Sequence, residues 1–446
     1  MSEAITASLE SEDSRNVAWF QFPRPPRRSL LVAVACLLLL AGILAASHQS
    51  WTASRQPAPI KLGLLHSKTG PLAVTESAWL EGELLAIEEI NAEGGVLGRP
   101  VEAVVADGRS DWPTFASEAE RLITEEHVVS IVGCWASASR KTVKPVIERL
   151  AHLLVYPEAY EGLEQSPNIF YIGAAPNQQI LPALKWGLER FGPRVFLVGS
   201  DYVWPHSVNA IMKDRLKPLG GELVGEEYIA LGSSRVEGIV EAIKAARPDV
   251  IFSAIAGDTN APFYRALRAA GLNAETVPVM SFSIGENEAR AFPTADFAGH
   301  YVASSYLGSL DNPVNRDFVE RYRKRFGADK FASEGVASGY VAVRLWAQAV
   351  RSAGTTRVDA IRAALRNQSF EAPEGIVSID RETQHAWRQA SLGRIGPDGR
   401  VEVAWTAARA IRPVPYPNSR TPARWEAFLD DLYQRWGNSW ANPVGE

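Results

Sequence analysis

The fold is decided by residues 130–162, which read SIVGCWASASRKTVKPVIERLAHLLVYPEAYEG. A short apolar run that ends at Gly133 predicts a buried strand, and a turn of small residues follows it. Residues from about 140 to 150 have the spacing of an amphipathic helix, and a second apolar run, residues 152–156, predicts the next strand. Strand, helix and strand in this order form a right-handed βαβ unit of a parallel sheet.

Both turns of this unit lie at the carboxyl edge of the expected sheet, where ligands bind in such folds. They carry aromatic, hydroxyl and carboxylate side chains, namely Trp135, Ser137, Ser139, Tyr156, Glu158 and Tyr160. With the free amides at the helix start, these groups suit a small, planar, hydrogen-bonding solute. The alternative is structural: Ser137 or Ser139 caps the helix while the aromatic rings fill a core.

The composition indicates a globular protein of two lobes. The 446 residues exceed the usual size of one domain, and 46% hydrophobic with 22% charged residues is ordinary for a soluble chain. A formal net charge of −5 without a basic stripe argues against nucleic-acid binding. The histidines lack metal-ligand spacing, and Cys134 has no triad partner, so neither a metal site nor an enzyme is expected.

The N-terminus predicts export. Residues 30–46 are almost wholly apolar and follow Arg27 and Arg28, which favours an orientation with the N-terminus in the cytoplasm. The arginine pair resembles a twin-arginine signal, and residues 44–46 resemble a cleavage site. An uncleaved membrane anchor is the alternative. Either interpretation places the chain beyond the linker at residues 50–59 outside the cytoplasm, in a periplasmic or other extracytoplasmic location.

Strand-like and helix-like segments alternate from residue 60 onward. The first set has strands at 60–65 and 101–106 and helices at 79–91 and 115–126, before the central βαβ unit. The second set has strands at 194–199, 223–229, 249–254 and 277–281 and helices at 179–191, 208–219, 239–246 and 261–270. Two successive doubly wound halves predict an α/β protein with two lobes and a cleft between them. A helix at 336–352 is expected to cross back to the first lobe.

Several stretches carry a resemblance to a known family. They include IKLGLLHSKTGPLA from residue 60, GCWASASRK from residue 133, VGSDYVWP from residue 198 and PVMSFSIGENE from residue 278. The chain resembles the urea- and short-chain-amide-binding proteins of the type I periplasmic solute-binding family over about residues 59–417. The resemblance implies two Rossmann-like lobes, joined by three crossovers, that close on a solute without metal, cofactor or catalysis. It also implies an ABC permease as partner.

The segment pattern and the resemblance together divide the chain. We expect an export signal or anchor with linker at 1–58, a first lobe at 59–176 and 304–370, a second lobe at 177–303 and 371–417, and a C-terminal tail at 418–446. The tail holds a predicted amphipathic helix at 423–436. This helix is expected to pack on a lobe, and a surface for a protein partner is the alternative.

The resemblance also implies a ligand pocket. The residues it assigns are Trp135, Ser137, Tyr156 and Glu158 in the first lobe, and Tyr202, Trp204 and Gly257 in the second, with Tyr202 and Trp204 closing as a lid. Relatives carry a threonine or an apolar residue where this chain has Glu158. A carboxylate accepts hydrogen bonds from two N–H groups of an amide, urea or amidinium. Glu158 therefore favours a cation or a strong donor, and this departure weakens the assignment to urea.

Three alternatives stay open at this point. Amino-acid receptors use the same helix start for an α-carboxylate, so the solute can equally be an amino acid. A membrane-anchored or exported ligand sensor of the amide-responsive regulator type is a second function. Asp258 and Glu286 are interpreted as solvated loop acids, with a place on the second-lobe wall as the alternative.

Overall fold

The computed structural model describes residues 32, 35–43 and 57–443, and the chain divides into two compact units, 1–56 and 57–446. In the first unit the described residues of the predicted export segment are helical and exposed. The twin arginines, the cleavage site and most of the linker lie outside the described residues. Within the part of the chain that the structure describes, no helix is both long and apolar enough to cross a membrane.

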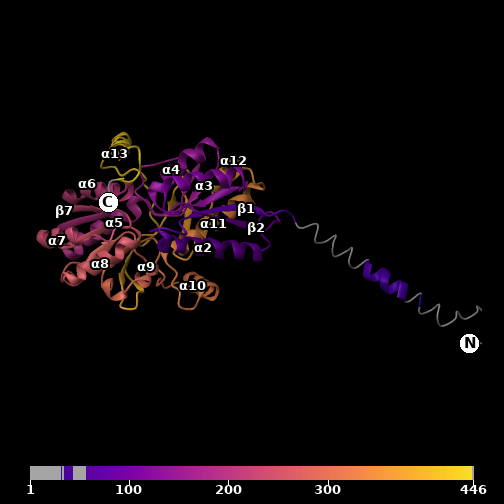
Figure 1. Cartoon of the computed structure of the whole chain (residues 1–446), viewed down its shortest axis with the longest axis horizontal. Helices are drawn as coiled ribbons and strands as arrows, with labels where there is room; N and C mark the ends of the chain where they lie inside the picture. The colour runs from indigo at the N-terminus through magenta and orange to yellow at the C-terminus, as the bar shows by residue number, and fades with distance from the viewer. Residues whose placement is uncertain (1–31, 33–34, 44–56, 444–446) are drawn as a thin grey trace, which may run out of the picture. The chain divides into compact units, whose positions relative to one another are not determined.

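The first lobe of the second unit is built on a five-stranded parallel sheet of order β2-β1-β3-β4-β5. The strands are β1 (Ile60–His66), β2 (Val101–Asp107), β3 (Ser130–Gly133), β4 (Leu154–Tyr156) and β5 (Ile169–Tyr171). The helices of this lobe are α2 (Ala73–Ala92), α3 (Trp112–Thr124), α4 (Ser137–Arg149), α11 (Glu334–Ala353) and α12 (Val358–Leu365) (Figure 1). The central strands are apolar and buried throughout, as parallel strands covered on both faces must be.

The second lobe is built on a seven-stranded sheet of order β15-β14-β10-β9-β8-β6-β7. The strands are β6 (Arg194–Ser200), β7 (Glu222–Ile229), β8 (Val250–Ala254), β9 (Val279–Ser281), β10 (Tyr301–Ser304), β14 (Ser391–Ile395) and β15 (Val401–Thr406). Its helices are α5 (Ile180–Phe191), α6 (Val203–Leu216), α7 (Glu237–Ala246), α8 (Asn260–Ala269) and α9 (Glu286–Ala291). Five strands run parallel, and β14 and β15 extend the sheet antiparallel.

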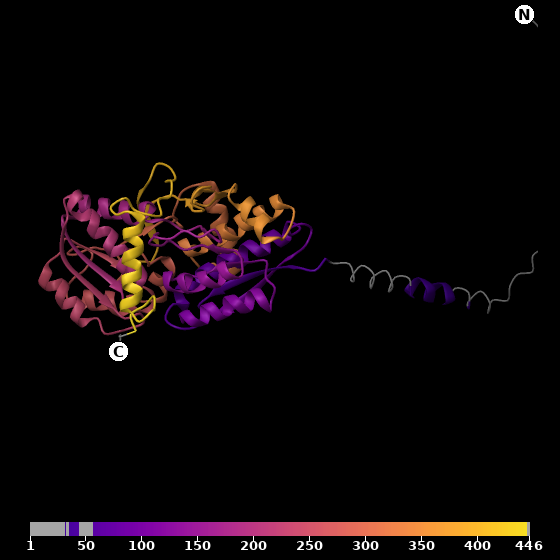
Figure 2. The same ribbon diagram turned by 90° about the horizontal axis from the view of Figure 1, so that it is seen from above.

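The remaining elements lie around the two sheets. They are α10 (Pro313–Phe326), a small antiparallel sheet of β11 (Ser369–Ala372), β12 (Gly375–Ile379) and β13 (Ala386–Trp387), and α13 (Pro422–Arg435). The prediction of a tail helix packed on a lobe is confirmed, because α13 packs on α6 and buries Trp425 and Leu432. Figure 2 shows α13 in yellow on the second lobe, and its residues share a groove with α4 of the first.

The predicted βαβ unit is confirmed as β3, α4 and β4. Helix α4 begins at Ser137 instead of near Arg140, because the extended backbone ends at Ala136 and the polar turn enters the helix. The hydroxyl of Ser139 then donates to the carbonyl of Ala136 at 2.7 Å. The lobe boundaries expected from the sequence stay a prediction.

The two lobes touch at a contact that we call the Pro71 latch, formed by Pro71 of the first lobe and by Gly232, Gly257 and Asp258 of the second. The backbone N–H of Asp258 donates to the carbonyl of Pro71 at 3.1 Å. Gly257 has a φ of +62°, and a Cβ atom added there would lie 2.5 Å from the Pro71 carbonyl oxygen. The latch therefore needs glycine for both its backbone conformation and its close approach.

Candidate functional site

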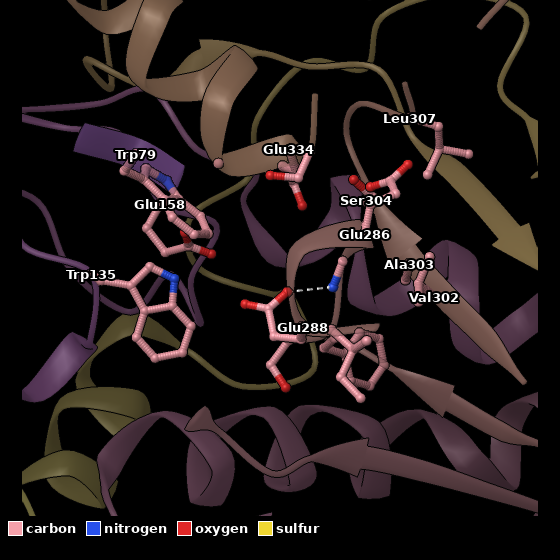
Figure 3. Close-up of a pocket in the computed structure, with 16 residues that line it drawn as sticks. Trp79, Trp135, Glu158, Glu286, Glu288, Val302, Ala303, Ser304, Leu307 and Glu334 are labelled. Atoms are coloured by element: carbon pink, nitrogen blue, oxygen red, sulfur yellow. Dashed lines mark hydrogen bonds between the residues drawn. The ribbon is translucent and has the colours of Figure 1, made fainter. Parts of the chain in front are cut away.

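A cavity of about 30 Å³ lies between the two lobes. Turns at the carboxyl ends of β3, β4 and β9 line it, together with β10 and the start of α11 (Figure 3). A second compartment of about 10 Å³ shares Trp135, Glu158 and Phe282 with the first, so both belong to one site. This is the position at which open α/β sheets bind ligands.

Tryptophan rings form the first-lobe side of the site. Trp79 and Trp135 meet edge to face with centroids 6.2 Å apart, and Trp204 lies across the smaller compartment with Tyr202. Each of these indoles is at most 7% exposed, and among the described residues none of the three Nε1 atoms has a hydrogen-bond partner. A buried N–H group without a partner is costly, so these donors are suited to an acceptor on a ligand.

Four glutamates surround the larger compartment. Glu158 follows β4, Glu286 and Glu288 stand in α9, and Glu334 begins α11 (Figure 3). Glu288 accepts from the N–H of Gly285 at 2.9 Å. Glu334 accepts from the N–H of Ser305 at 2.8 Å, whereas Oε2 of Glu158 is buried without a partner. No lysine, arginine or histidine is among the described residues that line the cavity.

The protonation of these acids follows from their burial. Burial, followed by the repulsion of Glu334, raises the pKa of Glu158 well above its usual value. Burial also raises the pKa of Glu286 to about 8 and raises the pKa of Glu288. Because carboxylates without water or a counter-ion ionise reluctantly, this wall retains protons at neutral pH.

The sequence-predicted residues lie in three places. Trp135 and Glu158 line both compartments, and Ser137, Tyr202 and Trp204 line the smaller one. The other two predicted residues do not line either compartment. Tyr156 lies behind the wall, where its hydroxyl donates to the carbonyl of Trp135 at 2.7 Å, and Gly257 stands in the Pro71 latch. Which of these residues contact a solute stays a prediction.

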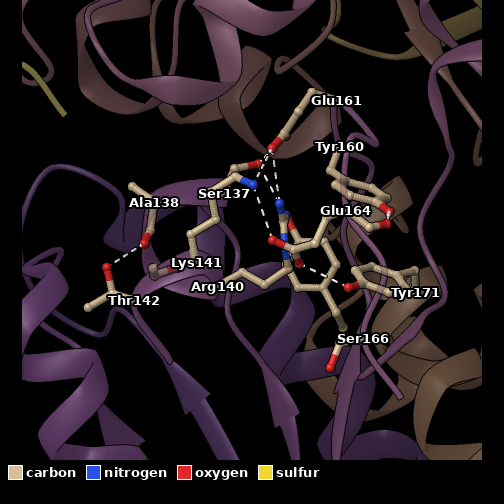
Figure 4. Close-up of polar contacts among 12 residues, drawn as sticks. Ser137, Ala138, Arg140, Lys141, Thr142, Tyr160, Glu161, Glu164, Ser166 and Tyr171 are labelled. Atoms are coloured by element: carbon tan, nitrogen blue, oxygen red, sulfur yellow. Dashed lines mark hydrogen bonds and ion pairs between the residues drawn. The ribbon is translucent and has the colours of Figure 1, made fainter. Parts of the chain in front are cut away.

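The Ser137 side chain is also part of a buried charged group that we call the Arg140 cluster: Ser137, Arg140, Lys141, Glu161 and Glu164 (Figure 4). Arg140 contacts Glu161 and Glu164 at 3.0 Å each, and Lys141 contacts Glu164 at 3.1 Å. The Ser137 hydroxyl donates to Glu161 and accepts from Nη1 of Arg140 at 3.1 Å. Its proton is therefore already used within the protein.

Reasoning from the sequence missed several lining residues. Trp79 projects from the middle of α2 and Glu334 begins α11. Neither stands at the end of a strand, where the sequence predicted the ligand contacts. The interpretation of Glu286 as a solvated loop acid is wrong, because its side chain is 3% exposed and lines the cavity. The same interpretation is right for Asp258, which is exposed.

Comparison with known proteins identifies the family. The family described as "Periplasmic binding protein domain" matches residues 60–422. The chain therefore belongs to this family of solute-binding proteins, and it is a binding protein and not an enzyme.

The chain is also similar to individual proteins, which differ in how much of their length it covers. The "Leu/Ile/Val-binding protein homolog 7" of Brucella melitensis is 25% identical over 414 residues, which are 87% of this chain and 99% of that protein. A "Limonene hydroxylase" of Geobacillus stearothermophilus is 33% identical over 114 residues, but this chain spans only 21% of that protein. A match of that extent carries no conclusion about activity.

Solved structures show the same fold. A solute-binding protein of an ABC transporter from Rhodopseudomonas palustris, in complex with 3,4-dihydroxybenzoic acid, matches with a TM-score of 0.72 at 21% identity over 79% of this chain and 98% of that one. A branched-chain amino acid transporter substrate-binding protein from Streptococcus pneumoniae, in complex with isoleucine, matches with a TM-score of 0.69 at 22% identity over 78% of this chain and 99% of that one. These likenesses establish the two-lobed α/β fold, and neither of the two bound solutes is urea.

Proposed function

We propose that this chain is an extracytoplasmic receptor for a small, N–H-rich solute of the urea and short-chain amide class. The observation that carries this proposal is that one cavity combines unpaired indole N–H donors with carboxylate acceptors. A planar amide offers the complementary set: N–H donors, a carbonyl oxygen and two apolar faces that suit aromatic rings.

The partner we propose is an ABC permease. The two solved structures named above are solute- or substrate-binding proteins of transporters, and the N-terminal sequence resembles an export signal or membrane anchor. A receptor held or released outside the cytoplasm delivers its solute to a permease in the membrane. The transport role is favoured over that of a ligand sensor, because a cytoplasmic regulator needs no apolar N-terminal segment.

A branched-chain amino acid is the second candidate, supported by the names of the curated relatives. Its ammonium group would suit the glutamates, but no basic residue among the described lining residues meets its carboxylate. Aromatic acids fit less well, because no basic residue among the described lining residues meets their carboxylate either.

A ligand panel tests the proposal. Thermal unfolding is measured with urea, formamide, acetamide, leucine, isoleucine and benzoate, because a solute that binds the folded state raises the melting temperature with its concentration. We expect a shift with urea or an amide. A shift with leucine or benzoate and none with any amide or urea would contradict the proposed solute class.

A variant then places the solute at Glu158. Glu158→Gln keeps the shape of the side chain and replaces one acceptor oxygen with an N–H donor that opposes the solute's own. We expect the affinity for the best amide to fall about tenfold, because the new N–H group leaves one hydrogen-bond donor without an acceptor in a desolvated site. Glu237→Gln, at an exposed position on α7, is the matched control. Equal affinity in both variants would remove Glu158 from the site.

A further inference from the structure

We infer that the preferred solute is a small organic cation that carries an amidinium, guanidinium or ammonium group together with a carbonyl oxygen. This inference rests on the proposed function and narrows its solute class. It starts from the cavity wall, where four glutamates from three separate elements converge on one space: Glu158, Glu286, Glu288 and Glu334 (Figure 3).

The wall has an excess of negative groups that the described part of the protein does not neutralise. Glu76 lies behind it and adds to the repulsion at Glu158, although Nδ1 of the buried His66 lies 3.5 Å from Oε2 of Glu76. The buried Arg388 is linked to Glu334 only through the Ser305 hydroxyl and forms its own ion pair with Glu374 at 2.9 Å. Since like charges in a desolvated site cannot all ionise unaided, the wall holds either protons or a cation.

The opposite wall defines the rest of the solute. Trp79 and Trp135 present aromatic rings, which attract a cation placed over their faces. Their unpaired indole N–H groups need an acceptor, which an amidinium or ammonium group lacks. A carbonyl oxygen on the same molecule supplies that acceptor, so the cavity as a whole fits a cation and an amide in one solute.

The protonation of the wall gives an independent signature. Burial raises the pKa of Glu158, Glu286 and Glu288, which favours the protonated forms of these acids when no cation is bound. A cation that binds there must displace protons, whereas a neutral solute leaves them in place. The titratable groups that line this space are Glu158, Glu286, Glu288 and Glu334, and Glu76 stands behind them beside His66.

Calorimetry of the full chain with two matched pairs of solutes tests the inference. Guanylurea is a planar cation with a carbonyl oxygen, and biuret is its neutral counterpart; guanidinium and urea form the second pair. At pH 7, where guanylurea is mainly protonated, we expect each cation to bind at least tenfold more tightly than its neutral partner. Heats measured in buffers of different ionisation enthalpy should show proton release with the cations alone.

Two variants locate the effect. Glu286→Gln and Glu288→Gln should each weaken guanylurea binding about tenfold and change biuret binding less than threefold, because only the cation uses the charge. Glu237→Gln, exposed on α7, should change neither. The wild-type comparison decides the inference even where a variant fails to fold.

The outcomes separate the inference from the proposed function. Binding of urea or biuret that equals or exceeds that of the matching cation overturns the inference and leaves the amide receptor standing. Cation binding without proton release, or unchanged in both glutamate variants, overturns the assignment to this wall. Absence of binding by all four compounds, with leucine or benzoate bound, overturns both.

Discussion

Two buried groups of acids lie side by side in this protein, and they differ in what balances them. In the Arg140 cluster, Glu161 and Glu164 are paired with Arg140 and Lys141 at 3.0 to 3.1 Å, apart from the longer contact of Lys141 with Glu161 at 3.8 Å. In the cavity wall, four glutamates face one another, and no basic side chain is among the lining residues within the described chain. Ser137 stands between the two groups: its hydroxyl donates to Glu161 of the Arg140 cluster, and its residue lines the smaller compartment of the cavity.

The difference shows in the acids themselves. Burial favours the neutral form of Glu164, but Lys141 and Arg140 outweigh it and hold the pKa of Glu164 well below its usual value. Burial without a cation raises the pKa of Glu158 and Glu286. The acids of the Arg140 cluster are therefore balanced by basic residues of the protein itself. The acids of the cavity wall are not, and a bound solute can supply the balancing charge.

The largest effect is expected from breaking the balance of the Arg140 cluster. Arg140→Met keeps much of the side-chain volume but leaves Glu161 and Glu164 buried with Lys141 as their remaining ion-pair partner among the described residues, and with the charge of Lys144 near Glu164. We expect the free energy of unfolding to fall by about 3–5 kcal/mol, measured by thermal denaturation without added solute.

The matched control lies on the same helix. Arg149 pairs with Glu120 at 3.0 Å, but its side chain is 55% exposed. Arg149→Ala should cost less than about 1 kcal/mol because solvent screens the pair. Similar losses of unfolding free energy in the two variants would show that the buried cluster stabilises the protein no more than an exposed ion pair does.

The stability of the protein should depend on pH through the acids of the cavity wall, and in the opposite direction from its dependence through Glu164 of the Arg140 cluster. Glu286 has an ordinary pKa of 4.5 when unfolded and about 8 when folded, so between these values the folded state holds a proton that the unfolded state has lost. Stability must then fall as the pH rises through this window. We expect a loss of about 2 kcal/mol from pH 5 to pH 8, since neighbouring acids share the protons.

Thermal denaturation at both pH values, without added solute, checks this slope. Glu286→Gln removes the titrating group and should flatten the slope, whereas Glu237→Gln, at an exposed position, should leave it unchanged. In contrast, the stability that Glu164 contributes is present above its unfolded pKa and is lost as the pH falls. An unchanged slope in Glu286→Gln would mean that the wall is hydrated.

A third change tests whether closure creates the difference between the two groups. Gly257→Ala places a Cβ atom against the Pro71 carbonyl and should hold the lobes apart, letting water reach the cavity acids but not the Arg140 cluster. We expect solute affinity to fall about tenfold, or about 1.4 kcal/mol, measured by calorimetry.

Gly271 provides the control for this substitution. It has a similar φ of +77°, but an added Cβ atom meets nothing within 4 Å. Gly271→Ala therefore carries the same backbone cost without the clash, and it should leave affinity unchanged. A loss of affinity in both variants would point to backbone strain instead of lobe contact.

The smallest effect is expected at Ser137, between the two groups. Ser137→Ala removes the hydroxyl that donates to Glu161 and accepts from Arg140, and we expect about 1 kcal/mol less stability. Affinity should change less than threefold, because the hydroxyl proton is already used inside the cluster. A tenfold loss of affinity with unchanged stability would assign Ser137 to the solute.

The sequence predicted the part of the site that lies directly after the strands of the first sheet, at their carboxyl ends. Trp135 and Glu158 come directly after β3 and β4, so their place at the carboxyl edge followed from the strand pattern. Trp79 and Glu334 reach the cavity from helices, through packing of α2 against α11, which are far apart in sequence. No local pattern reports such a contact.

The sequence also did not show which buried acids are paired with basic residues and which are not. The segment from Arg140 to Glu164 shows acids and bases but not which of them pair, and GENE at residues 285–288 reads as an exposed loop. Both the pairing of charges in the first segment and the burial of the glutamates in the second depend on tertiary packing. Tyr156 shows the converse: its position after two buried residues of β4 suggested a ligand contact, but its ring packs behind the wall.

The Pro71 latch has a consequence for how closure can be observed. Its hydrogen bond joins two backbone groups, so substituting the Asp258 side chain leaves its donor and acceptor in place. Proline has no N–H of its own, and the bond therefore runs in one direction, from the Asp258 amide. That single amide should exchange with solvent deuterium slowly when the lobes are together and quickly when they part. One peptide resonance in the second lobe thus reports the state of the whole receptor, independently of any solute or fluorophore.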